Sequence, residues 1–268
     1  MSWSLLESSL GCRMPSRNTS QKPSLARSKK TCLPTCRQSC QCQCMMIVFA
    51  NSKGGVGKST LAVHCAAWLF DHGYKTALLD ADKQRSSSAW LAEVEPQVTI
   101  RTATTAEECA VIAQELLRSH DFVVGDAPGG LEDLSRTLLI LGDLAVFPIS
   151  PSILDVRSVV TATEVLRYAQ AIRGGMPEGR LVLNKMKTRG RISTQLRDES
   201  PKLGLKVATS VIRNLEIFCD APQQGTVVTR LRHKAPQAAA ELDALFSELL
   251  APQLAQHGFI QGGKVSNG

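Results

Sequence analysis

A lysine-flanked glycine cluster is the stretch of this sequence best suited to chemistry, and it reads Lys-Gly-Gly-Val-Gly-Lys-Ser-Thr over residues 53–60. Glycines let the backbone turn tightly and direct successive amide hydrogens at an anion. A short apolar strand precedes the stretch and a helical pattern follows it, so the positive end of a helix faces the same place. We expect Lys58 to reach the terminal phosphates of a nucleotide and Ser59 to bind Mg²⁺. The other residues of this predicted cradle are Lys53, Gly54, Gly55, Val56, Gly57 and Thr60.

Carboxylates end two other predicted strands. Asp80 and Asp82 follow one apolar strand, and Asp126 closes another, "FVVGD". Ligands of parallel sheets bind at the carboxyl ends of the strands, so we expect these acids beside the phosphate cradle. Asp80 and Asp126 join Ser59 as predicted metal ligands, and Asp82 is predicted to orient the attacking water. The alternatives are that Asp80 or Asp82 only caps the following helix, and that Asp126 is a plain acid at the end of a strand.

The glycine cluster resembles the deviant Walker A motif of the ParA/MinD family of ATPases. Ser52 stands where the general P-loop pattern has its first glycine, and Lys53 precedes the cluster. In that family the extra lysine crosses a dimer interface and touches the phosphates of the partner's nucleotide. The resemblance therefore implies ATP and Mg²⁺ as ligands, a homodimer, and a catalytic Lys53 that acts in trans like an arginine finger. The alternative is a solvated lysine in a loop.

Three further stretches resemble parts of the same family. "DADKQ" is similar to switch I, except that Lys83 replaces the usual proline and leaves the rigidity of the loop open. "DAPGG" resembles the Walker B strand and switch II, in which the amide of Gly129 approaches the γ-phosphate. Asn184 matches a position that often contacts adenine, although an asparagine there is also a common turn former. In the later loop, over residues 219–228, Pro222 is the expected contact with the base.

Short apolar strands alternate with helix-length segments from Met45 onward, which predicts an α/β fold with a mostly parallel, doubly wound sheet and helices on both faces. The expected strands are 45–50, 75–80, 98–103, 122–126, 144–150, 180–184 and 206–212. The expected helices are 59–71, 86–94, 105–119, 131–141, 153–172 and 236–254, the third opened by a capping box from Thr104 to Glu107. We expect the ATPase domain over residues 45–257 and a flexible tail over residues 258–268.

The first 44 residues differ from the rest in charge and in cysteine content. They hold seven of the 31 basic residues and one of the 24 acidic ones, so that residues 45–268 have a net charge of only +1. They also hold six of the nine cysteines, four of them in the crowded run "CRQSCQCQC", unlike the spaced pairs of a zinc site. The composition predicts a disordered tail, with a transit peptide as the alternative. Cys65, Cys109 and Cys219 suit a reduced, cytoplasmic protein.

Other branches of the family leave signatures that are missing here. No cysteine follows Asp126 closely and no Cys-x-x-Cys lies near the C-terminus, which argues against an iron–sulfur protein. No apolar run reaches 18 residues, which argues against a transmembrane helix. The last predicted helix carries Glu241, Asp243 and Glu248 rather than a basic face, so we expect it to pack on the sheet and not on a membrane surface.

Positive charge gathers in residues 180–234, which hold twelve basic and four acidic residues, against eleven and sixteen in residues 45–179. Such a segment favours salt-sensitive, non-specific DNA binding, although a solvated face is the alternative. The candidate DNA contacts are Lys185, Lys187, Arg189, Arg191 and Arg213.

The resemblance then implies a ParA-like partition ATPase on the bacterial nucleoid, released when a ParB-like centromere-binding protein stimulates hydrolysis. The rivals are a positioning or conjugation ATPase without DNA binding, and a small-molecule enzyme of the dethiobiotin synthetase type.

Overall fold

The computed structural model describes residues 44–130, 133–151, 153–187 and 205–256. Its strands are β1 (Met45–Phe49), β2 (Thr76–Asp80), β3 (Thr99–Thr102), β4 (Phe122–Asp126), β5 (Leu144–Ile149), β6 (Glu178–Met186) and β7 (Lys206–Arg213). Its helices are α1 (Lys58–Asp71), α2 (Ser86–Val94), α3 (Ala106–Ser119), α4 (Asp133–Leu141), α5 (Ile153–Ile172), α7 (Ile217–Gln223), the 3₁₀ helix η3 (Val228–Arg230) and α8 (Pro236–Gln256). The predictions for residues 1–43 and 258–268 lie outside the described residues.

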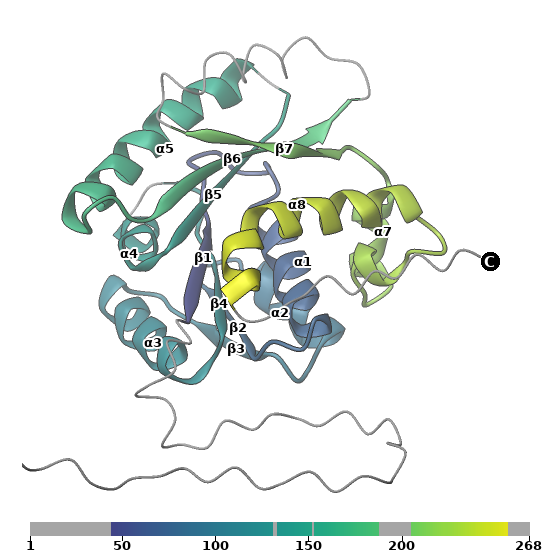
Figure 1. The fold of residues 1–268 in the computed structure, drawn as a ribbon, viewed down its shortest axis with the longest axis horizontal. Coiled ribbons are helices and arrows are strands. Elements are labelled where there is room, and N and C mark those ends of the chain that lie inside the picture. The colour runs from purple at the N-terminus through teal and green to yellow at the C-terminus, as the bar shows by residue number, and fades with distance from the viewer. Residues whose placement is uncertain (1–43, 131–132, 152, 188–204, 257–268) are drawn as a thin grey trace, which may run out of the picture. The chain divides into compact units, whose positions relative to one another are not determined.

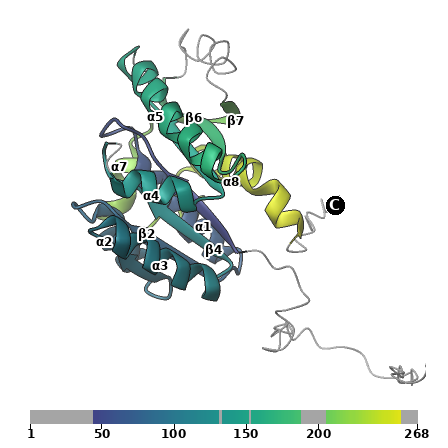
Figure 2. The ribbon, with the colours of Figure 1, turned by 90° about the vertical axis from the view of Figure 1, so that its left-hand side faces the viewer.

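The strands form one parallel, seven-stranded sheet in the order β3-β2-β4-β1-β5-β6-β7. Figures 1 and 2 show the helices in two layers, with α1, α2, α7 and α8 on one face and α3, α4 and α5 on the other. This arrangement confirms the predicted α/β class. Parallel strands need crossover connections, and helices in those connections cover both faces of the sheet.

Every strand except the edge strand β3 contributes to two separate cores, because alternate side chains of a strand point to opposite faces. In β1, Met45, Ile47 and Phe49 pack under α1, α2 and α8. Met46 and Val48 pack under α3, α4 and α5. A strand buried on both faces has no polar position, which is why "MMIVF" reads as a continuous apolar run in the sequence.

Two local predictions are wrong. The capping residue of α3 is Thr105, whose side chain accepts from the amide of Glu108, one position later than expected. The carboxylate of Glu108 in turn accepts from the amide of Thr104. The segment around Pro222 is also not a loop throughout, because its first part lies in the short helix α7. Pro222 has no N–H to donate to the helix ladder, and α7 ends one residue after it.

Helix α8 packs on the sheet as predicted, with Leu242, Leu245 and Phe246 fully buried. Its acids are internal partners of the fold. The carboxylate of Glu248 accepts from the amides of Thr209 and Ser210 at 2.6 and 2.9 Å, on the edge strand β7. Acidic side chains thus satisfy edge donors that a neighbouring strand would otherwise take. In the described part of the chain, no helix combines the length and the apolar character needed to cross a membrane.

Candidate active site

The predicted phosphate-side residues meet at one edge of the sheet. Strands β2, β4, β1, β5 and β6 are neighbours in that order, so their carboxyl ends form a continuous edge. Asp126 stands level with Asp80 on one side and with Phe49, near the end of β1, on the other. The glycine cluster starts four residues after β1, so parallel pairing alone brings it to the two carboxylates.

The glycine cluster has the backbone that its residue types demand. Gly55 and Gly57 have φ angles of 76° and 98°, in the left-handed region that favours glycine. The start of the loop is held by Asn51, which the sequence analysis did not single out. Its side-chain nitrogen donates to the carbonyl of Pro148 at the end of β5 (2.8 Å), and its oxygen accepts from the amide of Lys53 (3.1 Å). A fully buried polar residue between a strand and a glycine loop is the signal for such a role.

Lys58 points back into the loop from the first turn of α1. Its ammonium donates to the carbonyl of Lys53 at 3.2 Å, and the residue is only 6% exposed. Burial lowers the pKa of Lys58, while the nearby charges of Asp126 and Asp82 oppose that shift. Gly129, after β4, also lies here, because a Cβ built on it would be 3.9 Å from the Lys58 ammonium. The predicted switch II segment therefore borders the phosphate cradle.

Among the residues of the site, Asp126 has the surroundings that are least favourable to its negative charge. Both carboxylate oxygens are buried and have no hydrogen-bond partner of normal geometry among the described residues. Burial raises the pKa of Asp126 to about 7, with the charge of Asp80 acting in the same direction. The hydroxyls of Ser59 and Ser87 lie close enough to lower the pKa somewhat, and so does the charge of Lys58. A buried carboxylate without partners, next to a serine hydroxyl, fits a hydrated Mg²⁺ ion bound through oxygen ligands.

Asp80 and Asp82 hold the loop between β2 and α2 in place. The two oxygens of Asp80 accept from the amides of Asp82 (3.0 Å) and Ser88 (2.9 Å), so that Asp80 ties down the first turn of α2. Asp82 accepts from the amide of Gln84 at 2.9 Å. This local bond orders the loop without the proline that Lys83 replaces. Asp80 thus has the capping role left open by the sequence, through Ser88.

The end of β6 contacts the glycine cluster from outside. The side-chain nitrogen of Asn184 donates to the carbonyl of Val56 at 2.8 Å, and Asn184 is 4% exposed. The ammonium of Lys185 donates to the carbonyl of Gly55 at 2.7 Å. The structure therefore brings Asn184, the predicted adenine contact, beside the glycine cluster, and it brings Lys185, which was expected to contact DNA, to the same place.

The segment containing Pro222 packs against α1, the helix that follows the glycine cluster, and the buried His64 of α1 makes the contact. The amide of Val228 donates to Nε2 of His64 at 3.1 Å, which leaves Nδ1 to donate to the carbonyl of Thr60 at 2.7 Å. The ring of Phe218 also lies against the imidazole, with centroids 5.7 Å apart. Pro222 itself is half-buried on α7. His64 was missed because a lone histidine in an apolar helix has no motif.

Most described basic residues of the segment 180–234 are engaged within the fold. Arg213 pairs with Glu241 of α8, and Arg230 pairs with both Asp71 and Glu95. Further ion pairs join Arg180 to Glu178, Lys206 to Glu178, and Arg232 to Asp243. Lys187 is exposed, while Arg189 and Arg191 lie outside the described residues. Net charge over a segment thus overstates the charge available to a ligand.

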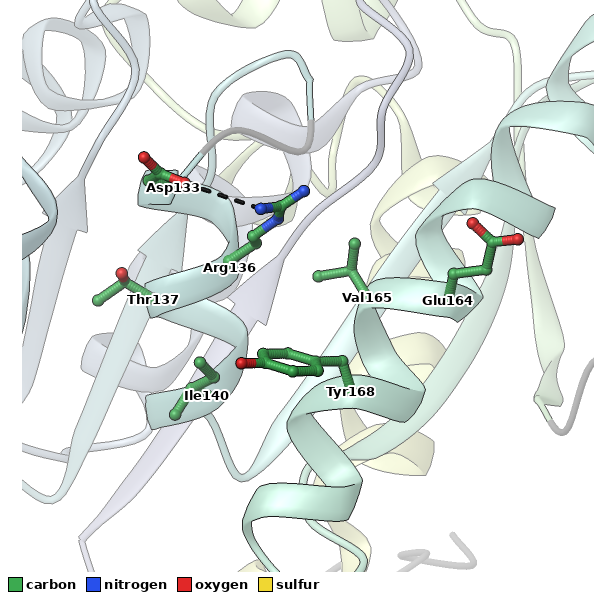
Figure 3. A pocket seen from close by; sticks show the side chains of 7 residues that line it. All are labelled: Asp133, Arg136, Thr137, Ile140, Glu164, Val165 and Tyr168. Carbon is green, nitrogen blue, oxygen red and sulfur yellow. Dashed lines mark ion pairs between the residues drawn. The ribbon is translucent and has the colours of Figure 1, made fainter.

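A groove of about 730 Å³ lies between α4 and α5 (Figure 3). Arg136 and Ile140 from α4 face Val165 and Tyr168 from α5, and Tyr168 is 59% exposed. None of the P-loop residues and none of the predicted metal ligands lines this groove. Elsewhere in the described ranges, His, Cys, Asp and Glu side chains nowhere gather in threes as a metal cluster.

The family described as the CobQ/CobB/MinD/ParA nucleotide binding domain matches residues 47–228 of the chain. The maintenance of carboxysome distribution protein A of Halothiobacillus neapolitanus is 28% identical over 211 residues, covering 76% of this chain and 95% of that protein. The chromosome-partitioning ATPase Soj of Thermus thermophilus is 26% identical over 234 residues, covering 72% of this chain and 91% of that protein.

Among solved structures, the ATP complex of an McdA variant from Cyanothece superposes with a TM-score of 0.64 at 16% identity. The superposition covers 82% of this chain and 98% of that one. At such identity the likeness establishes the fold alone.

Proposed function

Because the chain belongs to the CobQ/CobB/MinD/ParA family and is a P-loop ATPase of the ParA/MinD type, we propose that it is a dimerising switch that partitions DNA. ATP closes two copies into a homodimer, the dimer binds DNA without sequence preference, and a ParB-like partner stimulates hydrolysis and release. The observation that carries the proposal is that Asp82 and Asp126 lie near Lys58 of the glycine cluster, at one edge of the sheet. The curated similarity to a partition ATPase supports the DNA role.

We assign magnesium to the end of β4. Ser59, Asp80 and Asp126 are the proposed holders of the ion, directly or through water, and the unpartnered carboxylate of Asp126 fits this assignment best. The ion supplies positive charge to the β- and γ-phosphates during transfer of the terminal phosphoryl group. Lys58 adds its ammonium to the same phosphates, and Asp82 orients the attacking water.

The adenine contacts are assigned to the opposite side of the glycine cluster. Asn184 uses only one of its two amide hydrogens in the hydrogen bond to the carbonyl of Val56. Its side chain therefore retains one donor and one acceptor for a base. Pro222 supplies an apolar surface at the end of α7 for one face of the ring.

Lys53 is the proposed trans-acting lysine, and its replacement tests the dimer. Its backbone is fixed by Asn51 and Lys58, which presents the side chain at the start of the cluster. We expect Lys53→Ala to abolish ATP-driven dimerisation in light scattering, because the charge that bridges the two copies is lost, and to change nucleotide binding by the monomer less than about threefold. Lys83→Ala, an exposed lysine of the next loop, is the matched control. A normal ATP dimer of Lys53→Ala would refute this assignment.

DNA binding is tested at Lys187, which is exposed, and at Arg189 and Arg191, which lie outside the described residues. The proposal concentrates on Lys187 together with Arg189 and Arg191, since Arg213 is paired with Glu241. We expect the triple change of these residues to Glu to remove ATP-dependent retention of random-sequence duplex DNA. In the wild type, this retention should weaken as the salt concentration rises. ATP hydrolysis without DNA should stay at the wild-type level. Retention that survives the triple change would place the DNA surface elsewhere.

A second candidate function is the positioning of a protein cargo. The curated relative named for carboxysome distribution supports it. The two candidate functions share the ATP switch and differ in the cargo. A pull-down with the ATP-bound dimer separates them, because only the partition function requires binding to a centromere-bound protein. The groove between α4 and α5 contains no phosphate-side residue, so it is not the substrate pocket beside the phosphates that an enzyme of the dethiobiotin synthetase type needs.

A further inference from the structure

We infer that Lys185 is a positioning residue for the phosphate-binding loop and acts through the carbonyl of Gly55 rather than through DNA. Its ammonium lies 2.7 Å from that carbonyl oxygen. The neighbouring Asn184 donates to the next carbonyl, that of Val56, at 2.8 Å. Two consecutive residues of β6 therefore hold two consecutive carbonyls of the glycine cluster.

This pairing fixes the direction of the loop's amide groups. In a trans peptide unit the C=O and the following N–H point to opposite sides. Since the carbonyls of Gly55 and Val56 face β6, the N–H groups of Val56 and Gly57 point away from β6, and successive N–H groups directed to one side form an anion-binding concavity. Lys185 thus orients donors for a phosphate that it does not itself touch.

The glycine cluster and the end of β6 are in close contact at Gly57. A Cβ placed on Gly57 would collide with the side-chain nitrogen of Asn184 and lie 3.9 Å from Cε of Lys185. Glycine at position 57 is therefore required both by its φ of 98° and by the approach of β6. The loop and the strand end fit each other only with these residue types.

The backbone of Lys185 supports the same inference. Its φ is 55°, in the left-handed region that residues other than glycine rarely adopt. Such strain persists at functional sites where the surroundings hold it in place. Here it turns the lysine out of the strand pattern and toward the loop, at an irregularity in the pairing of β6 with β7.

The test compares Lys185→Met with Lys206→Met in the full chain. Lys206 is also exposed and also makes one contact through its ammonium, with Glu178 at the other end of the sheet. The readouts are the Kd of a fluorescent ATP analogue with Mg²⁺ and no DNA, the kcat at saturating ATP, and thermal unfolding without nucleotide. We expect Lys185→Met to raise the Kd about tenfold with kcat and the unfolding temperature nearly unchanged. Lys206→Met should bind nucleotide like the wild type.

Two further variants separate the ammonium from the backbone. Lys185→Gly relieves the positive φ but removes the donor, so we expect the same loss of nucleotide affinity as for Lys185→Met. Lys185→Arg keeps a donor and should stay within about threefold of the wild type. Normal affinity in both Lys185→Met and Lys185→Gly overturns the inference, as does a loss of DNA retention alone. The inference depends on ATP binding and not on DNA, so failure of the proposed partition role leaves it standing.

Discussion

Asp126 illustrates how a site residue can be recognised by what it lacks. A carboxylate that is buried without partners opposes folding, because desolvation penalises its charge. The neighbouring Lys58 and the hydroxyls of Ser59 and Ser87 offset only part of that penalty, and the pKa of Asp126 rises to about 7. In the proposed metal site, a divalent cation with its waters would remove this conflict.

Replacing Asp126 by its neutral isostere should separate stability from chemistry. At pH 8, above its pKa of about 7, Asp126→Asn removes a buried charge, and we expect the nucleotide-free protein to gain about 2–4 kcal/mol in free energy of unfolding. Mg²⁺-dependent ATP hydrolysis should fall more than about 100-fold. Urea unfolding and a phosphate-release assay measure the two effects. Asp133→Asn, at an exposed position, should change neither, and a less stable Asp126→Asn protein would contradict this account.

At the scale of elements, α1 is the part that joins the phosphate loop to the rest of the fold. His64 lies on its buried face, bonded to the carbonyl of Thr60 in the first turn and to the amide of Val228 in η3. Trp90 of α2 closes over the ring edge-on, with centroids 5.3 Å apart. One neutral imidazole thus links three elements around the start of the helix that receives the phosphates.

Acid should weaken this link. Burial lowers the pKa of His64 to about 4, whereas the unfolded chain has a value near the ordinary ~6.5. Between these values the unfolded chain binds the proton that the native chain excludes, so His64 lowers the free energy of unfolding as pH falls from about 6.5 to about 4, by about 3 kcal/mol in total. Urea unfolding measures the free energy of unfolding at each pH in this range. The decrease with falling pH should be absent in His64→Gln, which cannot titrate, and present in His233→Gln, a change at an exposed position. Parallel curves for wild type and His64→Gln would disprove it.

The pairing of β7 with α8 shows a second kind of link between elements. Glu241 and Glu248 lie seven residues apart, on one face of the helix, and both accept from backbone amides of the edge strand. Burial opposes ionisation of Glu248, but the hydrogen bonds from Thr209 and Ser210 outweigh it and lower its pKa. The acidic residues of the last helix are therefore structural acceptors rather than a solvent-facing surface.

At the scale of the molecule, much of the basic excess of residues 180–234 is paired with acids that lie outside this segment. Arg230 of η3 reaches Asp71 at the end of α1 and Glu95 after α2, and it also donates to the carbonyl of Val94. Ion pairs across elements far apart in sequence cancel charge that a count along the sequence keeps separate. A DNA surface must be sought among the cations that remain.

Removing such a pair should affect stability and leave DNA binding intact. We expect Arg230→Met to lower the free energy of unfolding by about 1–3 kcal/mol, because Glu95 is left buried without its partner. Arg232→Met breaks a more exposed pair and should cost less than about 1 kcal/mol. Both variants should retain DNA with ATP as the wild type does. Loss of retention in Arg230→Met at full stability would mean that this arginine faces DNA.

The sequence by itself determined the α/β class and most element positions, and it predicted the phosphate-side residues. These features are local: a strand buried on both faces must be apolar throughout, and a loop that wraps a phosphate needs glycines and a lysine in fixed order. Asp126 and Lys58 could be predicted as site residues because their chemistry depends on residue type and on the strand end or helix start beside them.

Only the tertiary structure decided which partners each charge and each carbonyl has. Lys185 was predicted to contact DNA because it lies in a basic segment. Nothing in the sequence indicates that it contacts a loop 130 residues earlier in the chain. Asn51 and His64 escaped notice for the same reason, since their roles exist only where β5 and η3 arrive. Hydrogen bonds and ion pairs depend on distance in space, and folding brings together groups whose separation along the chain says nothing about their contact.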